Sequence, residues 1–300
     1  MDCSKRLHDR IEVAFEDPHE VSPMCYKYIS FNWLGNCQMY EDGLCMLHAQ
    51  KGEDSLPKIC RLYPRSLKKI NDCYIACCSS SCEAVVEMLY TDKQMSIIKQ
   101  DLDLTPSIEY RVNEDMYSQL MRINNYLKDN SISLKQRIIN ICKYIDSEQF
   151  SQEYNNNDNP ISLAIEILNR LIQSQNFFAD ICNEIIDRYS NNQQQYYIDA
   201  KQFENKYIIW ETFFENVLNN SLIYENFPFV DECFDKTNAF KGLCASYGLL
   251  RIVCIGYTSI HSDENSLIDA VSGLFHLIDH TAFYYNINVI CDNTACLMKL

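Results

Sequence analysis

The chain has 300 residues, of which 47% are hydrophobic, and it carries a formal net charge of −15. Such a length and apolar content support a folded globular protein of one large or two modest domains. The acidic balance argues against a nucleic-acid partner, because a phosphate backbone requires clustered Lys and Arg. With 7 Gly and 7 Pro, an all-β protein built from many tight turns is disfavoured, and a mainly α fold is expected.

The N-terminal ten residues, MDCSKRLHDR, lack the apolar core of a secretion signal, so a cytoplasmic location is expected. The longest weakly polar run, Leu243 to Ile260, carries Arg251 near its middle, where a charge is costly at the centre of a bilayer. This run therefore predicts a buried helix, and no membrane is expected as a partner.

The cysteines are concentrated at the N-terminal end of the chain. Nine of the 16 fall in the first 82 residues: Cys3, Cys25, Cys37, Cys45, Cys60, Cys73, Cys77, Cys78 and Cys82. Disulfides are not the natural interpretation for a cytoplasmic protein, because the cytosol keeps thiols reduced. The clustering points to metal binding.

Gly and Pro divide the chain into two regions of different character. Residues 1–95 contain frequent Gly and Pro, which predicts a loop-rich, cysteine-containing metal-binding head. Residues 96–300 are expected to form an all-helical body on which this head packs, and this body is acidic because residues 83–300 carry a net charge of −14. The helical character of the body is supported by four sets of apolar residues at helical spacing. They are Ile138, Ile141, Cys142 and Ile145, then Ala164, Leu168 and Leu171, then Leu249, Ile252, Val253 and Gly256, then Val271, Leu274, Phe275 and Ile278.

Polar stretches predict exposed loops between the helices of the body. These are residues 155–159, 191–195 and 261–265.

The most informative segment runs from Cys37 to Cys45 and contains Gly43. Thiolate is the ligand that a soft metal or an iron–sulfur cluster prefers, and Gly43 allows a sharp turn that lets both cysteines face one centre. The chain contains no CxxC pair, so a zinc ribbon or finger fits poorly. The alternative, that these are ordinary buried thiols, stays open at this stage.

The motifs around these cysteines resemble those of the flagellin lysine-N-methylase family. They are Asp42-Gly43-Leu44-Cys45, Leu56-Pro57, Cys60-Arg61, Tyr63-Pro64-Arg65, and Cys82 ahead of Glu83-Ala84. The similarity extends into the body at Phe203-Glu204-Asn205, Phe213-Phe214, Phe227-Pro228-Phe229, Tyr247 to Arg251, and a terminal helix ending at His280. Residues 90–200 match the family in helical character alone.

The resemblance implies S-adenosylmethionine-dependent methylation of lysine side chains on flagellin, with an iron–sulfur cluster, of the 4Fe-4S type, taking part. The expected ligands of the cluster in this chain are Cys37, Cys45, Cys60 and Cys82. Arg61 and Arg65, in the basic cluster beside the cysteines, are candidates to hold the carboxylate of S-adenosylmethionine or an acidic patch of the substrate. A solvated charged face explains them equally well.

The chain departs from the family pattern at its N-terminal end. Family members carry a further cysteine group ending in an adjacent Cys pair, whereas no adjacent Cys pair precedes the match here. Cys73, Cys77, Cys78 and Cys82 form a local C-x3-CC-x3-C set that is a candidate replacement, with Cys78 and Cys82 expected on one helix face.

Three further side chains have two interpretations each. His48 is either a mixed ligand or a surface histidine on a helix, and Tyr63 either positions the methyl acceptor or packs against its own turn. His280 either belongs to the site or forms a hydrogen bond within the core.

A second function, from a different class, fits the same residues. The chain would then be a non-catalytic protein-interaction module, or an inactive short family member, whose cysteines bind zinc or iron structurally and whose acidic body docks a partner.

Overall fold

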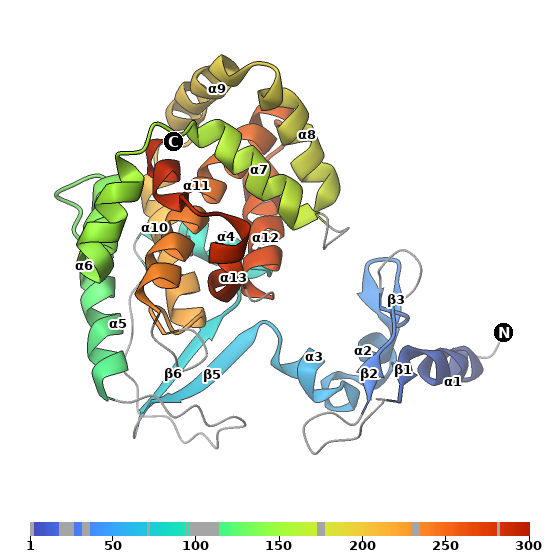
Figure 1. Cartoon of the computed structure of the whole chain (residues 1–300). Helices are drawn as coiled ribbons and strands as arrows, with labels where there is room; N and C mark the ends of the chain where they lie inside the picture. The colour runs from blue at the N-terminus through green and yellow to red at the C-terminus, as the bar shows by residue number, and fades with distance from the viewer. Residues whose placement is uncertain are drawn as a thin grey trace. The chain divides into compact units, whose positions relative to one another are not determined.

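The computed structural model describes residues 3–17, 27–31, 37–70, 73–93, 95, 114–172, 178–229, 235–280 and 283–300 (Figure 1). The chain forms two compact units, Met1–Tyr63 and Pro64–Leu300. The architecture is mainly α, as the sequence predicted.

The first unit combines short helices with two-residue strands. Its elements are α1 (Cys3–Ala14), β1 (Phe15–Glu16), β2 (Tyr28–Ile29), β3 (Tyr40–Glu41), β4 (Leu44–Cys45), α2 (Met46–Lys51), the 3-10 helix η1 (Glu53–Ser55) and α3 (Lys58–Leu62). Strand β1 pairs with β2, and β3 pairs with β4, both antiparallel. Within the described part of this unit the buried core consists of Leu7, Ala14, Met39, Met46 and Leu47.

The second unit begins with an antiparallel hairpin, β5 (Arg65–Ile70) and β6 (Cys73–Cys78). Helices then follow: α4 (Glu83–Thr91), α5 (Glu114–Leu127), α6 (Leu134–Tyr154), α7 (Pro160–Ile172), α8 (Ala179–Ser190), α9 (Gln193–Lys206), α10 (Trp210–Tyr224), α11 (Lys236–Ile260), α12 (Ser266–Asp279), α13 (Phe283–Ile290) and the 3-10 helix η2 (Thr294–Lys299).

Helix α11 is the central element of the second unit, and α6, α7, α8, α9, α12 and α13 pack around it (Figure 1). Asp235 caps its N-terminus by accepting hydrogen bonds from the backbone N–H groups of Thr237 and Asn238. A Cβ on Gly248 would stand 2.6 Å from the Cβ of Leu297, so the glycine lets η2 approach the helix closely.

Among the described residues, α11 is the one helix long and apolar enough to cross a membrane, and 83% of its most apolar stretch is buried inside the protein. The sequence prediction of a buried helix is confirmed, and Arg251 within it is buried too. Its charge is compensated: Nη2 donates to Glu204 Oε1 at 2.7 Å, and the guanidinium lies 4.5 Å from the centre of the Trp210 ring. The helix is therefore a buried core helix of the second unit.

The predicted apolar stripes all face the core. The side chains at the predicted positions of α6, α7, α11 and α12 are buried. The loops 155–159 and 261–265 are confirmed, whereas α9 begins at Gln193, so the predicted loop at 191–195 is shorter than expected. Helix α6 also contains an unpredicted kink at Asp146 (φ −151°, ψ 92°), whose Oδ1 accepts the backbone N–H of Gln149.

The boundary between the units lies earlier than residue 95, where the sequence placed it. Val86 and Leu89 of α4 belong to the large hydrophobic core, and Asn216 of α10 donates through Nδ2 to the carbonyl of Leu89 at 2.9 Å. Strand β6 also contacts α10. The last third of the cysteine-rich region therefore folds with the helices, because its apolar side chains are buried among them.

Candidate metal centre

The segment from Cys37 to Cys45 is a tight β-hairpin. Asp42 (φ 50°) and Gly43 (φ 83°) form the two-residue turn, and both have the positive φ that a type I′ turn requires. Tyr40 pairs with Cys45 across the hairpin, and the carbonyl of Cys37 accepts the backbone N–H of Tyr40 at 2.9 Å. The turn expected at Gly43 is confirmed, and it brings the two cysteines to neighbouring positions on one small scaffold.

Helix α1 holds this hairpin in place. Arg10 donates through Nη1 to the carbonyl of Gln38 at 2.8 Å, and Arg6 and Arg10 both form ion pairs with Glu41. Cys37 and Cys45, each half-buried, pack against the core of the unit. The backbone that carries both thiols is thus fixed by contacts from outside the hairpin.

Cys60, on α3, interacts electrostatically with these two cysteines, and the interaction affects its pKa. Its side chain is largely exposed, but partial desolvation of the sulfur raises its pKa, and the thiolates of Cys37 and Cys45 raise it further. A raised pKa favours the neutral thiol of Cys60, whereas a bound cation would favour the thiolate, which is the ligand of choice for iron and zinc. The three residues therefore fit a soft metal or a cluster in their chemistry.

The structure does not arrange these cysteines as a coordination sphere. Among the residues that the structure describes, no group of three or more His, Cys, Asp or Glu side chains is placed to hold a metal ion. If these cysteines bind a metal, their side chains would have to be drawn together, and binding would then be coupled to local ordering.

Cys82 belongs to the second unit, where it is the N-cap residue of α4. Its assignment to the same centre as Cys37, Cys45 and Cys60 stays a prediction. Cys78 ends strand β6, so the expectation that Cys78 and Cys82 share a helix face is wrong. A tight turn through three serines separates them, since Ser79 to Ser81 leave the strand before the helix begins.

That turn is anchored by a buried polar network. Ser79 Oγ and the backbone N–H of Ser80 both donate to Asp279 Oδ2, at 2.7 and 3.0 Å. Asn220 donates through Nδ2 to the carbonyl of Cys78 at 2.7 Å and to Ser80 Oγ at 2.9 Å. Helices α10 and α12 therefore fix the backbone between Cys78 and Cys82.

His280 joins the network from the C-cap of α12. Its Nε2 lies 2.8 Å from Ser81 Oγ, although the imidazole itself is exposed. It forms a hydrogen bond with a buried hydroxyl at the edge of the core, so of its two interpretations the hydrogen bond is the one observed.

The basic candidates fall in different units. Arg61 is exposed on α3, whereas Arg65 is exposed on β5 and stands directly opposite Cys78 in the hairpin register. Burial raises the pKa of Cys78, and the charge of Arg65 opposes that effect. Arg65 is thus placed beside a cysteine, and the role of both arginines toward S-adenosylmethionine stays a prediction.

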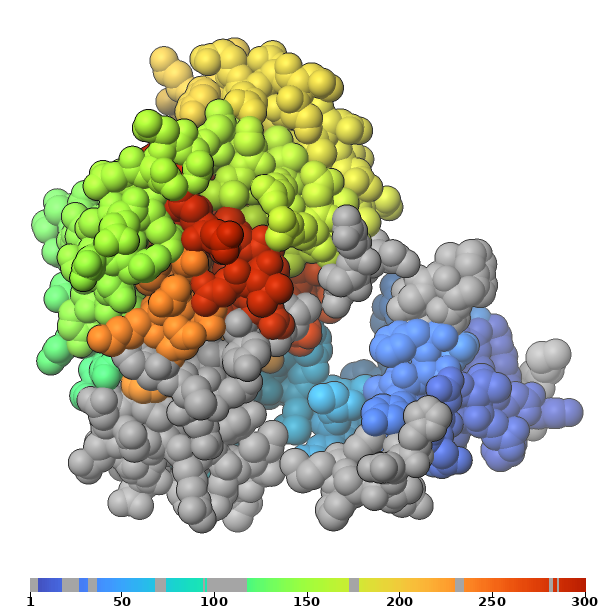
Figure 2. Space-filling model, in the orientation of Figure 1, coloured from blue at the N-terminus to red at the C-terminus, as the bar shows by residue number. Residues whose placement is uncertain are grey.

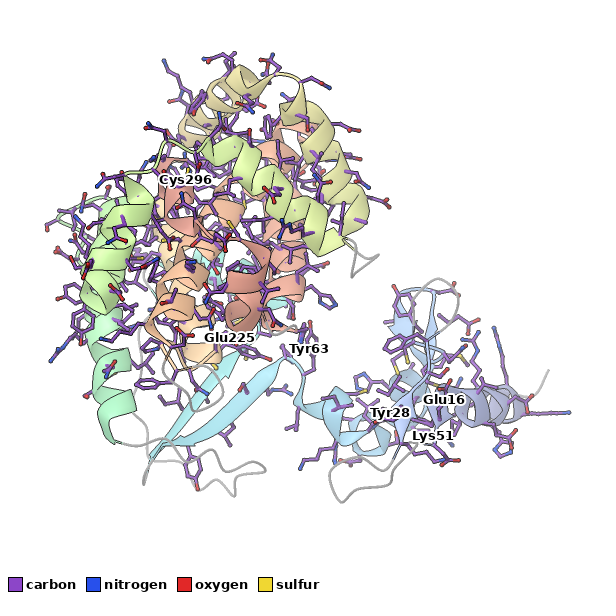
Figure 3. All side chains as sticks on the ribbon, in the orientation of Figure 1. Glu16, Tyr28, Lys51, Tyr63, Glu225 and Cys296 are labelled. Atoms are coloured by element: carbon purple, nitrogen blue, oxygen red, sulfur yellow. The ribbon has the colours of Figure 1, made fainter. Side chains whose placement is uncertain are left out.

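His48 and Tyr63 occupy surface positions. His48 is exposed on α2, as the second interpretation of it predicted. Tyr63, labelled in Figure 3, is exposed at the C-cap of α3. Among the other cysteines, Cys25 and the side chains of Cys3 and Cys73 lie outside the described residues.

Sequence reasoning missed the residues that position the cysteines. Arg10, Asn220 and Asp279 contact the cysteine segments from 28 to 200 positions away in the chain. Asn220 and Asp279 are buried polar residues within apolar helices. A polar residue at an apolar helix position is the one sequence signal that it forms a hydrogen bond with a segment elsewhere in the chain.

Comparisons of the chain with family models, with curated proteins and with solved structures found no match.

Proposed function

We propose that this chain is a cytoplasmic iron–sulfur protein that uses S-adenosylmethionine to methylate lysine side chains of flagellin. The observation that carries the proposal is the hairpin that holds Cys37 and Cys45 on one scaffold, with Cys60 in the same unit. The pKa of Cys60 is raised by its burial and then by both of these cysteines. The reaction itself is taken from the resemblance of the motifs around these residues to flagellin lysine-N-methylases.

The size of the first unit supports a bound metal. Five buried hydrophobic residues form the core in its described part, which is little for a unit that ends at Tyr63. Units of this size commonly need a metal or disulfides to remain folded. A metal held by the hairpin cysteines and by Cys60 would tie the hairpin to α3.

The proposed reaction moves a methyl group from the sulfonium sulfur to the lysine Nε, giving S-adenosylhomocysteine and methyl-lysine and releasing one proton. A lysine ammonium has no lone pair, so a polar transfer requires that this proton leave first. A bound cluster supplies one-electron chemistry, which relaxes that requirement. Arg61 and Arg65 are the residues proposed to hold the carboxylate of S-adenosylmethionine.

Methyl transfer is tested directly with the full chain purified without oxygen. The protein is incubated with isotopically labelled S-adenosylmethionine, a reductant and unmodified flagellin, and the flagellin is analysed by mass spectrometry. We expect labelled methyl-lysine, and we expect none when S-adenosylmethionine is omitted. A preparation that contains iron and inorganic sulfide but leaves flagellin unmodified would rule out the methylase assignment.

A purely structural metal is the second candidate, and the small core of the first unit is the observation that favours it. In that case the cysteines bind zinc or iron, the unit folds around the ion, and the acidic body docks a partner. Metal analysis separates the two candidates, since a colourless zinc protein fits the second and not the first.

A further inference from the structure

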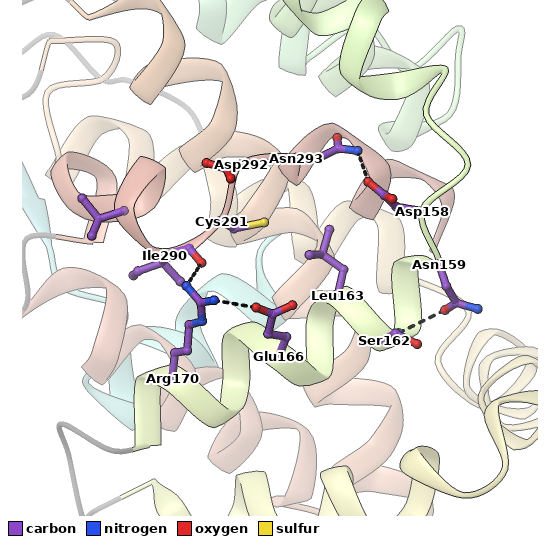
Figure 4. A pocket seen from close by; sticks show the side chains of 11 residues that line it. Asp158, Asn159, Ser162, Leu163, Glu166, Arg170, Ile290, Cys291, Asp292 and Asn293 are labelled. Atoms are coloured by element: carbon purple, nitrogen blue, oxygen red, sulfur yellow. Dashed lines mark hydrogen bonds and ion pairs between the residues drawn. The ribbon is translucent and has the colours of Figure 1, made fainter.

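A cleft of about 390 Å³ lies between α7 and the chain that joins α13 to η2 in the second unit (Figure 4). Arg170 spans it, donating through Nη1 to the carbonyl of Ile290 and through Nη2 to Glu166 Oε1, both at 2.6 Å. Figure 2 shows the C-terminal segment, in red, beside α7 on the face displayed. These contacts explain how the segment is held on α7, and no ligand is inferred there.

Two histidines lie one helical turn apart at the C-terminal end of α12. His276 stands in the last turn of the helix, and His280 is its C-cap residue. Residues four positions apart lie on the same helix face, and the centres of the two imidazole rings are 5.0 Å apart with 66° between the ring planes. His276 is half-buried and His280 is exposed, so solvent reaches the pair.

The hydrogen bonds of His280 determine which of its ring nitrogens carries the lone pair. An ionised carboxylate only accepts, so the single proton of the Ser79 hydroxyl goes to Asp279 Oδ2. The hydroxyl oxygens of Ser79 and Ser81 are 2.7 Å apart, and this hydrogen bond therefore uses the proton of Ser81. The imidazole of His280 must then donate through Nε2–H to Ser81 Oγ, at 2.8 Å. In neutral His280 the lone pair accordingly lies on Nδ1.

This chain of hydrogen bonds prepares the imidazole of His280 for a metal. A histidine that binds a metal usually donates its other ring N–H to a carboxylate, a carbonyl or water, which fixes the tautomer and makes the ligating nitrogen more basic. Here Nε2–H donates to Ser81, and the chain continues through Ser79 to the buried carboxylate of Asp279. Nδ1 of His280 is thus the nitrogen suited to bind an ion.

The electrostatic surroundings of the two rings also favour a metal. Burial lowers the pKa of His276, and burial together with the charge of His276 lowers the pKa of His280. Both imidazoles are therefore neutral at neutral pH, and metal binding requires the neutral form because an imidazolium has no lone pair. The C-terminal end of α12 carries the partial negative charge of the helix dipole, which stabilises a cation there.

The separation of the rings suits one shared ion. Because a zinc-like ion binds an imidazole nitrogen at about 2.0–2.1 Å, two rings that share it have their centres about 5 Å apart, as observed. Imidazole is a ligand for ions of intermediate softness, whereas Mg²⁺ prefers oxygen. The matching class is therefore a divalent transition metal.

We propose that His276 and His280 form a clamp for one divalent transition-metal ion, such as Zn²⁺ or Ni²⁺. His280 binds the ion through Nδ1, and Ser81 orients that ring from the other side. Among the described residues no third His, Cys, Asp or Glu is placed with the pair, so water completes the coordination. The clamp lies within the second unit and uses no cysteine, so it stands whether or not the first unit holds a cluster.

Nuclear magnetic resonance of the full chain, with its six histidines isotopically labelled, tests the clamp with Ni²⁺ as a paramagnetic probe. We expect Ni²⁺ to broaden the imidazole signals of His276 and His280 together, since both rings bind the same ion. Mg²⁺ at the same concentrations should leave both signals sharp. Signals that stay sharp in excess Ni²⁺, or that Mg²⁺ shifts as strongly as Ni²⁺ broadens them, would overturn the proposal.

His276→Gln removes one of the two ligands and should raise the Ni²⁺ concentration needed to broaden His280 at least about tenfold. Loss of a group that merely orients a ligating imidazole already costs about 10–100-fold in metal affinity. His8→Gln is the matched control, because His8 pairs with Glu12 at the same spacing on α1 but is a single imidazole. This control should leave the response of His280 unchanged. Equal responses of His280 in the two variants would show that the histidines do not share an ion.

Discussion

Replacing Cys60 with serine is expected to remove most of the iron from the purified protein. A serine hydroxyl stays protonated at neutral pH and is a poor ligand for a soft metal. If four ligands contribute equally to the free energy of metal binding, the loss of one weakens metal binding by about 3 kcal/mol, or about a hundredfold. Cys60 is exposed, so the substitution leaves the hydrophobic core intact. Iron per chain, measured after removal of loosely bound metal, reports the result.

Cys296→Ser is the matched control for this substitution. Cys296 is buried in the second unit and donates to the carbonyl of Asp158, a hydrogen bond that a serine hydroxyl can also donate. This variant should retain the iron content of the unaltered protein. If Cys60→Ser retained as much iron as Cys296→Ser, Cys60 would not be a ligand.

Replacing Glu215 with alanine should lower the free energy of unfolding by about 3–5 kcal/mol. The carboxylate of Glu215 on α10 lies 2.6 Å from Arg137 Nη1 on α6, and the two side chains are 1% and 3% exposed. The same Nη1 donates to the carbonyl of Leu127 at 2.5 Å and to Asn130 Oδ1 at 2.9 Å. Without Glu215 the buried guanidinium loses its compensating charge, and urea denaturation measures the cost.

Two comparisons separate the loss of charge compensation from the loss of packing. The double variant Arg137→Met and Glu215→Leu removes both charges and should recover most of the stability. Glu166→Ala breaks the exposed pair with Arg170, whose side chains are 48% and 55% exposed, and should cost less than about 1 kcal/mol. A cost for Glu215→Ala no larger than that of Glu166→Ala would contradict the account of a buried pair.

The helical body was predictable because apolar residues recur at helical spacing. The stripe at Ile138, Ile141, Cys142 and Ile145 specifies which face of α6 is buried, and the structure buries that face. The kink at Asp146 was not predicted, although Asp146 followed by Gln149 three positions later is a local N-cap pattern. Its cause lies in the competition of the Asp146 side chain for a backbone N–H.

The candidate site was predictable where its geometry depends on residues that are close together in the sequence. The Asp42-Gly43 turn follows from the positive φ that these two residue types tolerate, and it places Cys37 and Cys45 on one hairpin. Long-range partners were not predictable: Arg65 opposite Cys78 depends on strand register, and Asp279 bonds to Ser79 across 200 positions. Such pairings are decided by packing of the whole unit, which a single sequence does not display.

Iron and acid-labile sulfide, measured in the full chain after purification without oxygen, test the central claim most directly. Mutual proximity of the thiols of Cys37, Cys45 and Cys60 predicts a brown protein with iron and sulfide in about equal amounts. A colourless protein that holds zinc, or one that holds no metal at all, would contradict it.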